Sequence, residues 1–324
     1  MPEVSVIIPC FNATGTLGRQ LEALFSQESA PEFEIVVVDN RSTDDLAGFV
    51  ASVTPPAHVS VRLVEAPEVA GAAYARNVGV READGDLLLF CDADDVVSAW
   101  WVAHALRTFE VADVWSGSCI PVPGSAFALP LEQIRALIDD TAVWRPPVRE
   151  QEGSFFPVLM GGNFGVRRDT MLALGGFDAG APAGGEDNDL GIRAGLAGFP
   201  TVTCKVTKIA YRQRDGGAAA RRAATNAARA QVQLGMRYGI WKHSAYRHWV
   251  RDLARAFAAH VRQVLRPRRV RDVEATKVRI AVAFTIGATR VAHLCGRPLP
   301  LQRIGLGLDA PASPTPTSTA TGSA

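Results

Sequence analysis

The sequence predicts an α/β protein built on a parallel sheet with crossover helices, and two observations indicate this. Apolar, strand-like runs alternate with helix-like segments through the first hundred residues. Polar clusters follow several of these runs directly, as is typical where the strands of an open sheet end beside a ligand. At 324 residues, 48% hydrophobic and 21% charged, the chain is long enough for one large domain or two small ones.

Each predicted strand is a short apolar run bounded by turn residues, and each predicted helix lies between two such runs. The last strand, for example, is an uninterrupted apolar run between Asp86 and Asp92. We expect strands at residues 4–8, 34–39, 59–64 and 87–91, and helices near residues 18–26, 44–52 and 72–82.

Asp92, Asp94 and Asp95 follow the last of these strands. Carboxylates held together at the end of a buried strand lose hydration, and a hard divalent cation compensates for that loss. Mg²⁺ or Mn²⁺ suits a site of oxygen ligands in which substrate phosphates complete the coordination. We expect Asp94 as a direct ligand, Asp92 at the ribose or a metal-bound water, and Asp95 in support. An acidic cap of the next helix is the alternative interpretation.

Six blocks of the sequence follow one another along the chain, and they are SVIIPCFN, EIVVVDNRSTDD, AGAAYARNVGV, DGDLLLFCDADD, GGNFGVRRDTMLALGGFD and GGEDNDLGIRAGLAGF. In this order they resemble the family-2 inverting glycosyltransferases of GT-A fold, over about residues 4–214. The resemblance implies a single nucleotide-sugar-binding, Rossmann-like mixed sheet flanked by helices and followed by a C-terminal helical extension. It also implies transfer of a sugar from a nucleoside diphosphate sugar, UDP-linked or related, to an acceptor hydroxyl.

The resemblance implies donor contacts in all of these blocks except the last. Asn40 stands where many relatives carry a second aspartate, which weakens any inference about the base that is bound. An Asx turn is the alternative role for Asp39, and a surface position is the alternative for Arg76. The implied donor-binding residues are Pro9, Phe11, Asn12, Asp39, Asn40, Gly71, Arg76, Asn77, Asp92, Ala93, Asp94 and Asn163, with Asp92 and Asp94 also in the metal site.

Glu186 and Asp187 open a predicted helix. An inverting transfer is a single displacement, so a base must accept the proton of the acceptor hydroxyl. A carboxylate whose pKa is raised by burial and by a like-charged neighbour suits this role. The resemblance implies that Asp187 is the base and Glu186 its orienting partner. Simple complementation of the helix dipole is the alternative.

Many relatives carry a histidine after this helix as a further metal ligand, whereas this chain has Tyr211, Arg212 and Arg214 in the corresponding segment. Arginine cannot ligate a metal, but it can neutralise a diphosphate directly. We therefore expect strict metal dependence, with partial substitution of the metal by a cationic side chain as the alternative.

The net charge of +1 conceals an acidic and a basic part. Residues 1–211 contain 14 Lys and Arg against 28 Asp and Glu, whereas residues 212–279 contain 17 against 4. The basic part suits an anionic surface such as phospholipid, or it neutralises the acidic part across an internal interface.

Residues 245–265 predict an amphipathic helix that lies in a membrane interface or packs on the catalytic domain. The apolar run at residues 280–289 is too short to span a bilayer, so we expect peripheral attachment. The predicted helix has a basic stripe of Arg247, Arg251, Arg255, Arg262 and Arg266, and an opposite face of Trp249, Leu253, Phe257, His260 and Val264.

We expect a catalytic domain at residues 1–215, a basic helical region at 216–305 and a disordered tail at 306–324. Five scattered cysteines are typical of a reducing compartment, and a first strand at Val4 leaves no room for a signal peptide. These features predict a cytoplasmic protein, with the inner face of the cell membrane as a further option.

Two other functions compete with sugar transfer. A nucleotidyltransferase that forms nucleotide sugars needs a basic, glycine-rich loop after the first strand, and residues 9–12 contain no Lys or Arg. A non-catalytic module that binds lipid or nucleic acid would not need acidic residues at each expected catalytic position. We therefore expect an enzyme with no nucleic-acid partner, and a lipid-linked sugar or a growing polysaccharide among the open acceptors.

Overall fold

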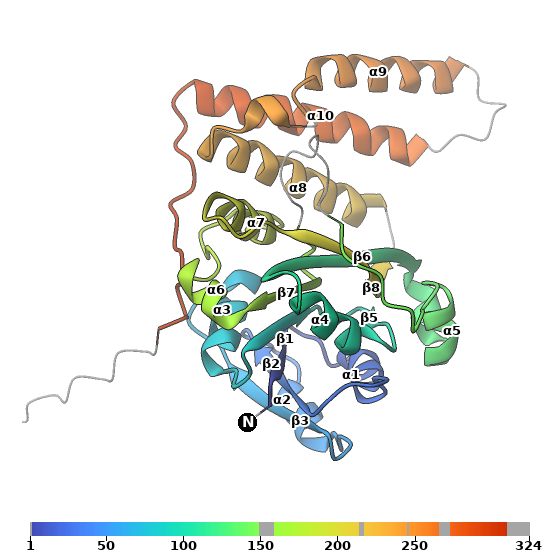
Figure 1. Cartoon of the computed structure of the whole chain (residues 1–324). Helices are drawn as coiled ribbons and strands as arrows, with labels where there is room; N and C mark the ends of the chain where they lie inside the picture. Colours follow the sequence, from blue (N-terminus) through green and yellow to red (C-terminus); the bar gives the residue numbers. More distant parts are fainter. Residues whose placement is uncertain (1, 149–158, 214–216, 245, 266–272, 310–324) are drawn as a thin grey trace, which may run out of the picture.

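An eight-stranded mixed sheet forms the centre of the computed structural model, which describes residues 2–148, 159–213, 217–244, 246–265 and 273–309. The strand order is β3-β2-β1-β4-β7-β6-β8-β5, and helices cover both faces of the sheet (Figure 1). The strands are β1 (Val4–Cys10), β2 (Phe33–Asp39), β3 (Val59–Glu65), β4 (Leu87–Cys91), β5 (Val96–Val97), β6 (Val114–Pro123), β7 (Asn163–Arg167) and β8 (Val202–Gln213).

The four predicted strands and three predicted helices of the first hundred residues are confirmed, with ends that differ by two residues at most. The helix predicted from residue 245 begins later, at Trp249, because residues 246–248 form a turn. The helices are α1 (Leu17–Phe25), α2 (Leu46–Ser52), α3 (Ala72–Glu82), α4 (Trp101–Phe109), α5 (Leu131–Ala136), α6 (Arg168–Ala173), α7 (Glu186–Leu196), α8 (Gly217–Arg237), α9 (Trp249–Leu265) and α10 (Val273–Leu294), with 3₁₀ turns η1 (Gly124–Ala128) and η2 (Trp241–His243).

Strands β3, β2, β1 and β4 are parallel, as the alternation of strands and helices predicts. Strand β7 then pairs antiparallel with β4, so the whole sheet is mixed, as the family resemblance implies. Because β1, β2 and β4 run in the same direction, their carboxyl ends meet at one edge of the sheet. This edge collects the polar clusters that follow the three strands.

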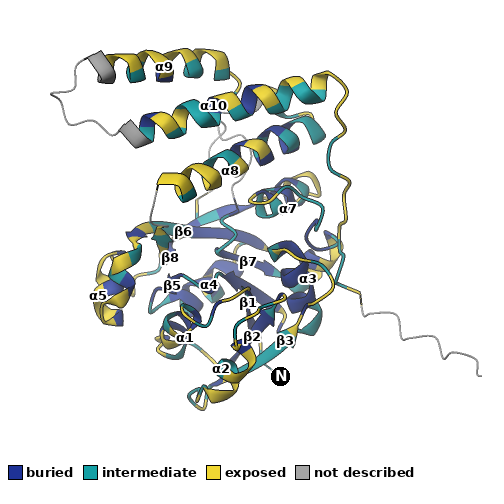
Figure 2. Cartoon of the chain, turned by 180° about the vertical axis from the view of Figure 1, so that it is seen from behind, coloured by how far each residue is buried: buried dark blue, intermediate teal, exposed yellow. Residues whose placement is uncertain are grey.

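The core lies on both faces of the sheet, which is buried along most of its length (Figure 2). Strand β4 shows why its sequence is apolar throughout: Leu87 and Leu89 belong to one core cluster, and Leu88 and Phe90 belong to the cluster on the other face. A strand that is covered on both faces has no solvent-facing side to make polar. The loop after β4 therefore begins from a strand that is fixed by packing on both of its faces.

Helices α8, α10 and α9 form a further layer beyond α7, at the end of the molecule away from β3 and α2 (Figure 1). Helix α10 packs between the other two: Ile286 joins a buried cluster with Ala228 and Val232 of α8, and Gly287 lies against Trp249 of α9. No helix in the described part of the chain is both long enough and apolar enough to cross a bilayer.

After α10 the chain returns along the sheet-containing body of the molecule (Figure 1). Leu306 and Leu308 pack against the core, and the Leu306 carbonyl accepts a hydrogen bond from Asn77 Nδ2 at 3.0 Å. The tail predicted from residue 306 therefore overlaps a packed segment at residues 306–309. Its remainder, from residue 310 on, lies outside the described residues, as do Arg266 and the rest of the basic cluster at residues 266–271.

Candidate active site

A cavity of 790 Å³ lies at the carboxyl ends of β1, β2 and β4. Loops that follow these three strands form most of its wall, the start of α3 forms another part, and the start of α7 contributes at one side. The convergence of distant polar segments, which the sequence predicts, is thus present. The predicted residues that line the cavity are Pro9, Phe11, Asn12, Asn40, Gly71, Arg76, Asp92, Ala93, Asp94 and Glu186.

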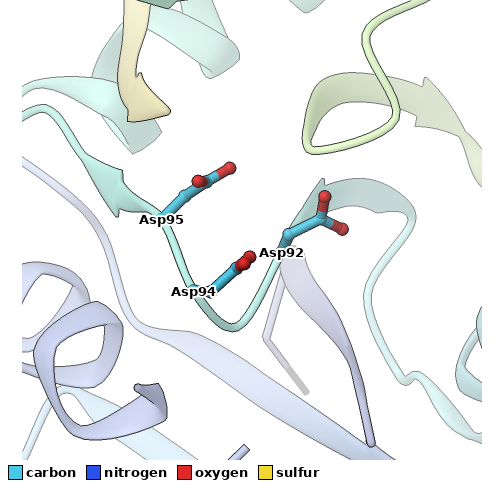
Figure 3. A group of neighbouring side chains, drawn as sticks. All are labelled: Asp92, Asp94 and Asp95. Carbon is cyan, nitrogen blue, oxygen red and sulfur yellow. The ribbon is translucent and has the colours of Figure 1, made fainter. Parts of the chain in front are cut away.

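The three aspartates after β4 project from the same side of their loop (Figure 3). One carboxylate oxygen from each of Asp92, Asp94 and Asp95 lies within 4.8 Å of the other two. Asp95 is 1% exposed, and its Oδ2 is buried without a hydrogen-bond partner. The sequence predicts Asp95 as a supporting residue, whereas its geometry makes it a candidate ligand in its own right.

The residues of this cluster fit a divalent cation. Burial, and then the charge of Asp92, raise the pKa of Asp95 to about 8, although the backbone hydrogen bond and the charge of Arg212 act in the opposite direction. The carboxylates therefore outweigh the positive charge at the buried end of the cluster. A Cβ on Gly162 would lie 2.8 Å from Asp92 Oδ2 and 3.2 Å from Asp95 Oδ2, so the glycine leaves room beside the carboxylates. An all-oxygen ligand set at this spacing suits Mg²⁺ or Mn²⁺.

Asn12 and Asp39 shape the wall of the cavity through local hydrogen bonds. Asn12 adopts a left-handed backbone conformation, with φ of 52°, and its Oδ1 accepts from the backbone N–H of Thr43 at 2.7 Å. Asp39 Oδ1 accepts from the backbone N–H of Ser42, three residues later, at 2.8 Å. This local bond spans one residue more than the Asx turn that was the alternative to a base contact. Both side chains therefore fix the loop after β2.

Asn40 is buried, and its amide organises the neighbouring loop. Its Nδ2 donates to the carbonyls of Ala66 and Val69 at 2.6 and 2.8 Å, and its Oδ1 accepts from the Gly71 N–H at 2.7 Å. An amide committed to three internal bonds is not placed to read a nucleobase, so the side-chain contact implied for Asn40 is not what the geometry supports. Asn40 instead holds Gly71 at the cavity wall.

Arg41 is a cavity residue that the sequence analysis missed. It is exposed, lines the cavity, and has a positive φ of 69°. A cation at the mouth of this cavity suits an anionic ligand. The available signal was its position directly after Asp39 and Asn40 at the end of a strand.

Arg76 connects the aspartate cluster to the start of α7. It is buried, and its Nη2 lies 3.0 Å from Asp92 Oδ1 while its Nη1 lies 3.3 Å from Glu186 Oε1. Nη2 also donates to the Gly161 carbonyl at 3.0 Å. Arg76 thus lines the cavity, and it forms ion pairs both with the aspartate cluster and with the start of α7.

Asn77 and Asn163, both predicted donor contacts, do not line the cavity. Asn77 donates to the carbonyls of Phe177 and Leu306, and its Oδ1 accepts from the Phe177 N–H. Asn163 accepts from Trp101 Nε1 at 2.8 Å and donates to the Ser118 and Thr207 carbonyls. Both are buried residues that join separate elements, so the structure supports a packing role for each.

Glu186 and Asp187 lie at the N-terminus of α7 and differ in their surroundings. Glu186 Oε2 accepts from the Gly184 and Gly185 N–H groups at 3.0 Å, and its Oε1 pairs with Arg76. Asp187 Oδ2 accepts from the Gly161 N–H at 3.0 Å. Burial, and then the charge of Glu186, raise the pKa of Asp187 to about 6 although Arg76 acts in the opposite direction. Asp187 is therefore the better suited of the two to accept a proton near neutral pH.

Arg212 supports the aspartate loop from behind. Its Nε donates to the Asp94 carbonyl at 2.8 Å, its backbone N–H donates to Asp95 Oδ1 at 2.9 Å, and its guanidinium carbon lies 3.8 Å from the centre of the Phe127 ring. Arg212 is not among the residues that line the cavity, so its position favours a loop-holding role over direct neutralisation of a diphosphate. Arg214, the other arginine considered for that task, lies outside the described residues.

The C-terminal helices contact the helix that carries Asp187. Arg237 of α8 lies 3.0 Å from Asp178 Oδ2 and 3.7 Å from Asp189 Oδ1, and both carboxylates are fully buried. Tyr238 donates to Asp189 Oδ1 at 2.6 Å, and Arg193 pairs with Asp189 Oδ2 at 2.8 Å. This buried network fixes α7 against α8.

Arg237→Gln is expected to lower the free energy of unfolding by about 3–5 kcal/mol, because it leaves buried Asp178 and Asp189 without a shared cation. Urea denaturation measures the change. Arg229→Gln is the matched control, since Arg229 is exposed on the same helix, and should change stability by less than about 0.5 kcal/mol. Equal stability of the two variants would refute the network's role.

Fold and site together define the class of protein: a GT-A glycosyltransferase fold with a carboxylate cluster at the end of its parallel strands. Residues 5–171 match the glycosyl transferase family 2 model, and the chain belongs to this family. It is 35% identical over 108 residues to an uncharacterized glycosyltransferase, YfnE, of Bacillus subtilis, a match that covers 33% of this chain and 27% of that protein.

A second relative is the poly(ribitol-phosphate) β-N-acetylglucosaminyltransferase TarS of Staphylococcus aureus, 33% identical over 99 residues that cover 30% of this chain and 17% of TarS. The chain thus matches about a quarter or less of the length of these two curated relatives.

Two solved structures share the fold at low sequence identity. The mannosyltransferase PcManGT from Pyrobaculum calidifontis, in complex with GDP-Man and Mn²⁺, aligns with a TM-score of 0.61 at 20% identity, over 90% of this chain and 87% of the other. Residues 1–349 of S. aureus TarS, in complex with UDP-GlcNAc, align with a TM-score of 0.50 at 15% identity, over 91% and 92%. The alignments extend beyond the family match and include most of the chain.

Proposed function

We propose that the protein transfers a sugar from a nucleoside diphosphate sugar to an acceptor hydroxyl, with inversion at the sugar carbon. The observation that carries the proposal is the position of Arg76, which links the aspartate cluster to the start of α7, where the proposed base Asp187 lies. A donor whose diphosphate lies at the cluster then has its reacting carbon near Asp187. Family membership and the GT-A fold support the same reaction class.

Asp187 acts as the base in this proposal. Its carboxylate accepts the proton of the acceptor hydroxyl while the acceptor oxygen bonds to the sugar carbon, and the bond from that carbon to the diphosphate oxygen breaks on the opposite face. The nucleoside diphosphate leaves with the bonding electrons. The charge of Glu186 raises the pKa of Asp187 and so makes it a stronger base. The bonds of Glu186 to Arg76 and to two backbone N–H groups hold the start of α7 in place.

Asp92, Asp94 and Asp95 would hold a divalent cation, Mn²⁺ or Mg²⁺. When bound, the cation neutralises the charge that develops on the leaving diphosphate. Asp92 is held at the cavity by Arg76, and the backbone of the Asp94–Asp95 turn is held by Arg212. The exposed guanidinium of Arg41 offers further positive charge at the cavity mouth.

The donor proposal draws on both solved structures. One has UDP-GlcNAc bound and the other has GDP-Man with Mn²⁺, so the same fold accommodates a pyrimidine and a purine nucleotide. In this chain the Asn40 amide is committed to the loop, which leaves the backbone around residues 9–12 and Arg41 to contact the base. We propose a UDP sugar or a related donor.

A panel of UDP and GDP sugars tests the function. Release of nucleoside diphosphate is measured with each donor in the presence of Mn²⁺, in Mg²⁺ and in EDTA. We expect at least one donor to be turned over with a divalent cation, and the rate to fall to background in EDTA. Turnover that is undiminished in EDTA after removal of bound metal would contradict the proposed site.

A further inference from the structure

Helix α9 carries an apolar row that its own packing does not use. Val250, Phe257 and Val261 are spaced by seven and four residues, so they lie along one side of the helix. All three are exposed, and Phe257 is 60% exposed. The sequence predicts Phe257 and Trp249 on one apolar face of this helix, but the structure separates them: Trp249 packs against Gly287 of α10 while Phe257 faces solvent.

Helix α10 carries a second exposed apolar row. Phe284 is 67% exposed, and Val291, seven residues later, is also exposed. Buried residues of this helix lie on its other sides: Ile286 packs against Ala228 and Val232 of α8, and Ala283 lies near Trp249 and Ala256 of α9. Two neighbouring helices therefore present large apolar side chains to solvent. Figure 2 shows these helices, α9 and α10, at the end of the molecule, with exposed residues along both. Exposed apolar rows on adjacent helices are typical of a surface that binds something.

Positive charge accompanies these rows. Arg251, Arg255 and Arg262 are exposed on α9, and Arg247 is exposed in the turn before it. At about 100° per residue, the three arginines of α9 lie beside the apolar row on the helix surface. Residues 217–309 contain 18 Lys and Arg against 4 Asp and Glu, whereas residues 1–211 contain 14 against 28. The helical layer at one end of the molecule is strongly basic, and the sheet-containing body is strongly acidic.

Exposed apolar side chains beside positive charge favour a partner that is both apolar and anionic. We propose that the exposed side of α9 and α10, defined by Val250, Phe257, Val261, Phe284 and Val291 with the α9 arginines, docks on the surface of an anionic phospholipid bilayer. Apolar side chains enter the boundary between headgroups and acyl chains, and arginines contact the anionic headgroups. The acidic body is repelled by the same surface, so the molecule binds with the helical layer toward the lipid.

A second copy of the chain is the competing occupant, and charge argues against it. Two copies that met through this face would bring their α9 arginines together, with Asp252, 3.5 Å from Arg251, as the one acidic side chain of each α9, and the excess of like charge opposes association. A bilayer that contains phosphatidylglycerol supplies the missing negative charge. The proposal concerns a surface outside the cavity and does not depend on the proposed reaction.

Vesicle co-sedimentation of the full chain tests the proposal. We expect binding to vesicles of phosphatidylcholine with phosphatidylglycerol, little binding to phosphatidylcholine alone, and release as salt concentration rises. Phe257→Ser with Phe284→Ser should weaken binding by about tenfold or more. Arg251→Gln with Arg262→Gln should weaken it by about 25-fold, at about fivefold for each charge removed.

Matched controls lie on the acidic body. Val111→Ser removes an equally exposed apolar residue after α4, and Arg19→Gln removes a surface charge of α1, and neither should alter vesicle binding. Circular dichroism confirms that each variant is folded, and Val250→Ser with Val291→Ser serves as a second apolar pair. Asp94→Asn should bind vesicles like the parent protein, which separates this test from that of the reaction.

Several results would overturn the proposal. The first is absence of binding to the anionic vesicles, and the second is equal binding by the parent protein and both double variants. The third is a dimer, measured by light scattering, that becomes a monomer in Phe257→Ser with Phe284→Ser while the parent protein does not bind vesicles.

Discussion

Asp187→Asn is expected to lower kcat by about 10²- to 10⁴-fold, because an amide cannot accept the proton of the acceptor hydroxyl. Folding should be retained, since asparagine keeps an oxygen that can accept from the Gly161 N–H. The pH profile separates this role from a structural one. Asp187 works deprotonated and its pKa is raised to about 6, so kcat of the parent protein should rise with pH up to about 6 and level off above it. The variant should lose this acid limb.

Two comparisons sharpen the test. Asp169→Asn changes an aspartate in the first turn of α6 that accepts from the next backbone N–H, as Asp187 does, so it measures the effect of a helix N-terminal charge alone. It should leave kcat unchanged. Glu186→Gln removes a charge that raises the pKa of Asp187, and should move the acid limb to lower pH. An Asp187→Asn enzyme with the parent's kcat and pH profile would show that the base lies elsewhere.

Asp94→Asn is expected to lower activity by about 10³-fold at saturating donor, because loss of a carboxylate weakens the cation that stabilises the leaving diphosphate. The Mn²⁺ concentration needed for half-maximal activity should rise as well. Titration of Mn²⁺ against initial rate measures both effects. The effect on the rate is expected to be large because Asp94 is one of the three carboxylates, with Asp92 and Asp95, whose charge would hold the cation.

The control for this variant lies on the same strand. Asp86→Asn changes an exposed aspartate just before the other end of β4 and should leave both the rate and the Mn²⁺ requirement unchanged. Asp95→Asn should resemble Asp94→Asn if Asp95 is a ligand. A parent-like Mn²⁺ requirement in Asp94→Asn would exclude this residue from the metal site.

The strands around the site were predictable because the burial that requires apolar residues is visible in each local stretch of sequence. A strand covered on both faces must be apolar throughout, and residues 87–90 show this directly in the sequence. The aspartates after β4 were predictable for the same reason, since the end of a buried strand fixes their position. The mixed character of the sheet depends on β7, whose pairing partner lies more than 70 residues earlier in the chain. Periodicity carries no information about such a partner.

The orientation of individual side chains was harder to predict from the sequence. Arg76 and Asn77 are neighbours in one motif, but successive residues of a helix point about 100° apart. Arg76 therefore reaches the cavity, whereas Asn77 binds the loops at Phe177 and Leu306. The contact between Arg237 and Asp178 joins residues 59 positions apart, and nothing in either local sequence indicates it. The match of six blocks predicted where the site lies better than it predicted what each residue in it contacts.

The central claim is that the aspartates after β4 bind a nucleoside diphosphate through a cation. Isothermal titration calorimetry of the parent protein with UDP and with GDP, each in Mn²⁺ and in EDTA, measures this most directly. We expect one nucleotide to bind in Mn²⁺, and the same titration in EDTA to show binding that is at least tenfold weaker. Equally tight binding in EDTA, or unchanged binding by Asp94→Asn, would contradict the claim.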